Sequence, residues 1–84
     1  MSNVIMAVII DKRSTAVPTL QHILTTYGDI IHLRLGFHDL HHEYASENGQ
    51  IILQLKGDER RIHQLNQELS ALSLVKVTTM TLED

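Results

Sequence analysis

The chain has 84 residues, 43% of them hydrophobic, which is enough for one domain with a modest core. It contains no cysteine, so disulfides and thiolate metal ligands are excluded and a reducing, cytoplasmic location is expected. Ten acidic and seven basic residues give a net charge of −3. Because this is the wrong sign for a surface that neutralises phosphates, we expect no direct nucleic-acid partner.

The first predicted element is a strand over residues 4–10, a continuous apolar run rich in β-branched side chains. Since both of its faces are apolar, we expect it in the middle of a sheet. The run is too short to span a membrane and Asp11 follows it at once, so neither a membrane partner nor a targeting segment is predicted.

A helix is predicted next. Pro18 fits only in a first turn, so the helix begins no earlier than Ala16, and Gly28 is placed to end it. Its predicted apolar face consists of Val17, Leu20, Leu24 and Tyr27.

A β-hairpin is predicted from residues 29–37 and 49–56, because both segments alternate apolar and polar side chains. The first arm should turn Ile31, Leu33, Leu35 and Phe37 to one face, and the second arm Ile51, Leu53 and Leu55. We expect Leu33 and Leu35 to supply the core and Arg34 to face away from it.

A second helix should follow a turn at Gly57 and an N-cap at Asp58, and residues 74–82 should form a last strand. The helix has an apolar stripe of Ile62, Leu65, Leu69 and Leu72. The order βαββαβ predicts one α+β domain over residues 1–84 with the ferredoxin-like arrangement, a four-stranded antiparallel sheet with two helices on one face.

The other face of such a sheet is bare, although the first strand is apolar on both sides. An apolar patch of this kind is seldom left in water, so we predict a homo-oligomer, with a dimer as the basic unit and a tetramer as a larger form. Either Met6, Val8 and Ile10 or Ile5, Ala7 and Ile9 must point to the bare face. The candidate interface residues are Met6, Val8 and Ile52.

Arg34 and His32 share strand parity and are candidates for an anion-binding patch that takes a small-molecule ligand. Gly36 interrupts the same strand, where a glycine marks either a close approach by a ligand or a β-bulge. The alternative for Arg34 is a solvated or salt-bridging arginine.

His38, His41 and His42 lie together between the two hairpin arms and are candidate ligands for nickel or zinc. The alternative is a solvated polar loop, because the spacing matches no strong zinc signature. The sequence shows neither a nucleophile elbow nor a glycine-rich phosphate loop, so an enzyme is not expected.

In residues 31–37 (IHLRLGF) and 53–58 (LQLKGD), and in its order of elements over residues 4–82, the chain resembles the small ACT-like proteins known as iron-only hydrogenase system regulators. It is similar, more distantly, to the C-terminal domain of nickel-responsive repressors. The resemblance implies a ferredoxin-like regulatory domain that assembles through sheets or helices and senses a small ligand. It does not carry over the repressors' complete nickel site, which includes a cysteine, or their N-terminal DNA-binding segment.

We therefore expect a non-enzymatic regulatory or ligand-sensing module of the transcriptional-regulator type, without a DNA-binding segment of its own. One alternative is a metal-responsive domain that uses residues 38–42. The other is a small ferredoxin-like enzyme, such as an acylphosphatase or a dimeric-barrel monooxygenase.

Overall fold

The structure is a computed structural model that describes residues 2–37 and 49–82. Its elements, in chain order, are β1 (Ser2–Ile10), α1 (Val17–Thr26), β2 (Ile31–Phe37), β3 (Gly49–Gly57), α2 (Glu59–Ser70) and β4 (Val75–Leu82). The predicted order βαββαβ is confirmed. In the part of the chain that is described, no helix is long and apolar enough to cross a membrane.

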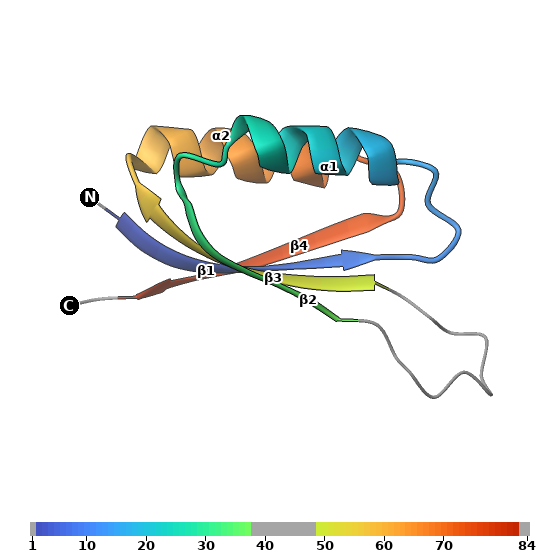
Figure 1. The fold of residues 1–84 in the computed structure, drawn as a ribbon, viewed down its shortest axis with the longest axis horizontal. Coiled ribbons are helices and arrows are strands. Elements are labelled where there is room, and N and C mark those ends of the chain that lie inside the picture. The colour runs from blue at the N-terminus through green and yellow to red at the C-terminus, as the bar shows by residue number, and fades with distance from the viewer. Residues whose placement is uncertain (1, 38–48, 83–84) are drawn as a thin grey trace.

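The four strands form one antiparallel sheet in the order β2-β3-β1-β4, with β1 and β3 at its centre. Both helices pack on the same face of this sheet and leave the other face uncovered (Figure 1). The fold is therefore the α+β, ferredoxin-like arrangement that the sequence predicts.

The core lies between the helices and the two central strands. Along β1, alternate residues are buried, and Met6 and Val8 have no exposed surface. The prediction that Met6 and Val8 form an interface on the uncovered face is therefore wrong, because these side chains point to the helices. The buried residues are Val4, Met6, Val8, Ile10, Leu20, Ile23, Leu24, Tyr27, Ile30, Ile51, Leu53, Leu55, Ile62, Leu65 and Leu69.

The two helices use their predicted apolar faces with one exception. In α2, Asp58 is the N-cap and its side chain accepts a hydrogen bond from the backbone N–H of Arg60 at 2.8 Å, as a capping aspartate should. In α1, Val17 is 40% exposed, because it lies in the first turn beyond the end of the core.

Tyr27, directly after α1, is held by side chains of α2. The guanidinium of Arg61 lies 4.2 Å from the centroid of the Tyr27 ring and donates a hydrogen bond to Asp29 at 2.6 Å. The Tyr27 hydroxyl donates to Glu68, and this hydrogen bond is the main reason that the pKa of Tyr27 is raised. These contacts fix the end of α1 against α2.

Gly57, the last residue of β3, packs closely against Ile30, the residue before β2. A Cβ added to Gly57 would lie 2.8 Å from Cγ2 of Ile30, closer than real Cβ atoms come to other atoms. Packing against Ile30 therefore favours glycine here. The neighbouring Lys56 donates its backbone N–H to the backbone carbonyl of Ile30 at 3.0 Å.

The residues of the edge strand β2 face other sides of the sheet than predicted. A register shift between Ile31 and Leu33 reverses the alternation, so Ile31 packs against the core while Leu33 and Leu35 do not. Arg34 pairs with buried Leu53, and residues directly opposite one another share a face of the sheet. Arg34 therefore lies on the helix side, and the prediction that it faces away from the core is wrong.

Candidate functional site

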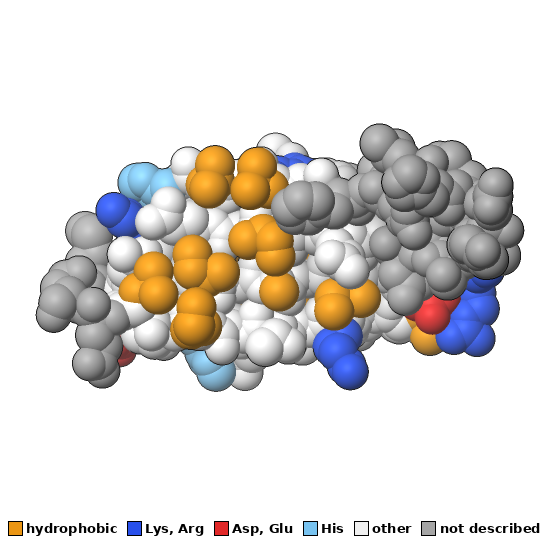
Figure 2. Space-filling model, turned by 90° about the horizontal axis from the view of Figure 1, so that it is seen from below, with side chains coloured by type: hydrophobic (Ala, Val, Ile, Leu, Met, Phe, Trp, Pro, Cys, Tyr) orange, Lys and Arg blue, Asp and Glu red, His pale blue; other side chains and the backbone are white. Residues whose placement is uncertain are grey.

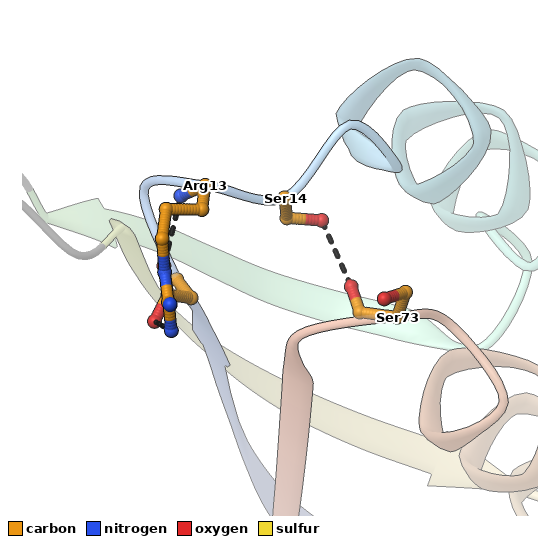
Figure 3. A network of polar contacts seen from close by, with 4 residues as sticks. Arg13, Ser14 and Ser73 are labelled. Atoms are coloured by element: carbon orange, nitrogen blue, oxygen red, sulfur yellow. Dashed lines mark hydrogen bonds and ion pairs between the residues drawn. The ribbon is translucent and has the colours of Figure 1, made fainter.

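The loop that follows β1 is held in place by two polar contacts (Figure 3). The Asp11 carboxylate accepts two hydrogen bonds from the Arg13 side chain at 2.9 Å and one from the Arg13 backbone N–H at 2.8 Å. The Ser14 hydroxyl donates to the backbone carbonyl of Ser73 at 2.9 Å. The loop is thereby joined to the segment between α2 and β4.

The contact with Arg13 also fixes the charge of Asp11. The side-chain hydrogen bond from Arg13 is the main cause that lowers the pKa of Asp11 from 3.8 to about 2, with the backbone hydrogen bond second. Asp11 is thus a carboxylate at every physiological pH, and its charge is matched by the guanidinium of Arg13.

Between this loop, the first turns of α1 and the ends of β2 and β3 lies a cavity of about 360 Å³. Arg34 enters it from β2, and its Nη2 donates a hydrogen bond to the amide oxygen of Gln21 on α1 at 2.6 Å. The lining residues are Ile10, Asp11, Lys12, Ser14, Val17, Gln21, Arg34, Gly36, Gly49, Gln50 and Ile51. The cavity therefore has apolar walls and a cationic group inside it.

Two of the three predicted ligand-binding residues meet in this cavity. Arg34 and Gly36 both line it, on the helix side of the sheet and not on the bare face where they were expected. His32 is exposed on β2 and is not a lining residue. The predicted pairing of Arg34 with His32 is therefore wrong, because the register shift beside His32 breaks their common parity.

The uncovered face of the sheet, which we call the open sheet face, carries apolar side chains from all four strands. Its apolar members are Ile5, Ala7 and Ile9 of β1, Leu33 and Leu35 of β2, Ile52 of β3, and Met80 and Leu82 of β4. Figure 2 shows hydrophobic side chains gathered across the middle of this face. Leu33, Leu35 and Met80 are 47%, 46% and 58% exposed, so the face is apolar and in contact with water.

No protein-family model matches the chain, and no curated protein matches it. Among solved structures, the uncharacterized protein TM1266 from Thermotoga maritima is similar over 96% of both chains, with 26% identity and a TM-score of 0.85. The fold is thus found at full length in a protein of similar size.

Two further structures share the fold at lower identity. CPII from Thiomonas intermedia K12, a nitrogen regulatory PII-like protein, is 13% identical, with 98% of this chain and 92% of that chain covered and a TM-score of 0.58. A dimeric ferredoxin-like protein of unknown function from Thermobifida fusca YX is 10% identical, with 96% and 92% covered and a TM-score of 0.51.

The predicted metal ligands His38, His41 and His42 lie outside the described residues, so the nickel or zinc site stays a prediction. Within residues 2–37 and 49–82, no group of three or more histidine, aspartate or glutamate side chains could hold a metal ion.

Sequence reasoning missed the residues that complete the cavity opposite Arg34. Gln21 is a solvent-facing position of a predicted helix, and nothing in its spacing singles it out. The contact arises because α1 lies over the helix side of β2. The register shift that turns Arg34 to that side lies between Ile31 and Leu33, whereas the pairing at Gly36 is regular, so the β-bulge considered there is not found.

Proposed function

We propose that the chain is a non-enzymatic regulatory module that senses a small ligand and works as a homo-oligomer with a two-fold symmetric dimer as its unit. The observation that supports this proposal is that the two sides of strand β2 belong to two different surfaces. Its residues alternate between the cavity, which Arg34 and Gly36 line, and the open sheet face, to which Leu33 and Leu35 belong. A ligand site and a self-association surface are thus built on opposite sides of one edge strand.

The open sheet face is large enough for a dimer. With neighbouring strands about 4.8 Å apart and about 3.3 Å per residue, four strands of seven residues cover roughly 440 Å² per subunit even as a flat footprint. The pair therefore buries on the order of 1,000 Å², the size at which specific interfaces begin. At about 25 cal/mol per Å² of apolar area, the roughly 440 Å² of one subunit contributes at most on the order of 10 kcal/mol of gross burial per subunit.

The composition of the face favours a second copy over a charged partner. Its centre is uncharged. The charged side chains at its described strand positions are Lys56, which pairs with Asn3, and Lys76, which pairs with Ile9, so they lie at opposite ends of β1. An apolar centre with polar residues at its rim is the usual anatomy of a protein interface. Two identical sheets can stack face to face about 10 Å apart, as in β-sandwiches.

The structural neighbours agree with a regulatory oligomer, since one is a nitrogen regulatory PII-like protein and another is described as dimeric. The sequence resemblance to ACT-like hydrogenase system regulators supports the same function. We propose on this basis that the chain serves a regulatory system by binding a small ligand.

Native mass spectrometry of the protein as purified tests the proposal, because it reports subunit number and any retained small molecule together. We expect an even number of subunits as the main species at micromolar concentration. A main species of one subunit would contradict the proposal.

A further inference from the structure

We infer that the cavity beside Arg34 binds a small organic monocarboxylate with a short apolar body, and that the Arg34 guanidinium anchors its carboxylate group. This inference deepens the ligand-sensing part of the proposed function and rests on it. It concerns a single subunit, so it can be tested independently of self-association.

Arg34 differs from two other arginines of the chain in what it contacts. Arg13 is bound to the Asp11 carboxylate and Arg61 to the Asp29 carboxylate, at 2.9 and 2.6 Å. Within the described residues, the hydrogen-bond partner of Arg34 is the neutral amide of Gln21. A guanidinium carries a positive charge and five N–H donors, so the described contact with one neutral amide matches neither the charge nor all the donors of Arg34.

The acidic residue of the cavity does not compensate this charge. Asp11 lines the cavity, but its carboxylate oxygens accept hydrogen bonds from Arg13. Among the described lining residues, the charge of Arg34 is therefore not matched by an acidic side chain, although the whole chain carries a charge of −3, so an anion is the ligand that we expect its electrostatics to select.

The shape of the cavity limits the size of the ligand. About 360 Å³ lies near the lower end of the range of roughly 300–1,000 Å³ that is typical of small-molecule pockets. Gly36 leaves open space, because a Cβ added there would meet nothing within 4 Å. The remaining walls include the apolar side chains of Ile10, Val17 and Ile51, which can contact a short hydrocarbon body.

A carboxylate fits these features better than a phosphate. A planar guanidinium forms bidentate pairs with carboxylates and phosphates alike, so the choice rests on the apolar walls. These walls can contact the hydrocarbon body of a carboxylate, whereas inorganic phosphate has no apolar part to place against them. Inorganic phosphate is therefore the comparison anion in the test.

The experiment is a ¹H–¹⁵N chemical-shift titration of the full chain with isovalerate, its neutral amide isovaleramide, and inorganic phosphate. We expect saturable shifts with isovalerate at the amides of the cavity-lining residues, Gly36 and Gly49 among them. Isovaleramide should bind at least about tenfold more weakly, because it lacks the charge that Arg34 recognises. Absence of a saturable shift with isovalerate, or equal binding of the amide or of phosphate, would overturn the inference.

Three variants locate the site. Arg34→Gln removes the charge and should weaken isovalerate binding at least about tenfold. Gln21→Glu places a carboxylate beside Arg34 as an internal competitor, and Gly36→Leu fills the open space, so both should weaken binding similarly. Arg60→Gln removes the same charge from an exposed position of α2 and should bind as the parent does. A folded Arg34→Gln variant with parental affinity would overturn the inference.

The outcomes separate this inference from the proposed function. If the parent protein self-associates but does not bind isovalerate, the inference of monocarboxylate binding is refuted and the proposal of self-association is not. If the parent protein binds isovalerate as a monomer, the proposal of self-association is refuted and the inference of ligand binding in the cavity is not.

Discussion

Asp11 shows how one side chain both shapes the cavity and makes stability depend on pH. Its carboxylate joins the end of β1 to the next turn by three hydrogen bonds from Arg13. Because its pKa is about 2 in the folded protein instead of 3.8, the unfolded chain binds more protons between these pH values. The stabilisation is therefore complete above pH 3.8 and is lost as the pH falls towards about 2.

We predict that Asp11→Asn flattens the decrease of the melting temperature between pH 4 and pH 2, because the group that takes up the proton is gone. Thermal unfolding followed by circular dichroism across this range is the measurement. Asp29, whose pKa is lowered mainly by the hydrogen bond from Arg61, should leave a residual slope in the variant. Arg13→Gln should flatten the curve as Asp11→Asn does, and an Arg13→Gln protein with the full parental slope would show that Arg13 is not the cause.

At the scale of the strand, β1 separates two functions by parity. Met6 and Val8 face the helices with no exposed surface, whereas Ile5, Ala7 and Ile9 lie on the open sheet face and are only partly covered. A substitution in one set should therefore unfold the domain, and a substitution in the other should affect association.

We predict that Met6→Ala lowers the free energy of unfolding by about 2–5 kcal/mol, because it leaves a cavity in the core. Ile5→Ala should cost about 1 kcal/mol or less at low protein concentration. Urea denaturation of the two variants and the parent at one fixed low concentration is the test. If Ile5→Ala proved to be the more destabilising change, the assignment of the two faces would be reversed.

The sequence predicts the elements and their order well, because the Asp58 cap, the proline in α1 and the apolar stripe of α2 are local signals. It could not decide which face of β1 the helices cover, since residues 4–10 are apolar on both sides. It also assigned Leu33 and Leu35 to the core. The register shift after Ile31 reverses which residues of β2 face the helices. The alternation of apolar and polar residues in the sequence does not reveal such a shift.

For the candidate site, the sequence singled out Arg34 and Gly36, which line one cavity, but not the residues around them. An arginine and a glycine stand out in an alternating strand, whereas Gln21 and Ser14 belong to the ordinary polar surface of a helix and a loop. Their meeting depends on how α1 lies over β2, which is a property of tertiary packing and not of any local pattern.

At the scale of the whole molecule, the layer structure is the reason that we propose a second copy against the open sheet face. Two helices cover one face of the sheet, and the second layer that would cover the open sheet face is absent from the described part of the fold (Figure 1). Since the cavity and the open sheet face share strand β2, ligand binding and self-association can influence one another. By thermodynamic linkage, such an influence must be reciprocal.

Sedimentation equilibrium of the parent and of Ile52→Lys tests the central claim, that a second copy covers the open sheet face. Ile52 lies between Ala7 and Leu35 on this face, so a lysine there puts a charge into the interface without touching the helix-facing core. We predict a dimer or a larger even-numbered species for the parent and a shift to monomer for Ile52→Lys. Gln64→Lys, which adds the same charge at an exposed position of α2, should associate as the parent does. A parent that stays monomeric up to about 100 μM, or an Ile52→Lys variant that associates as tightly as the parent, would contradict the account.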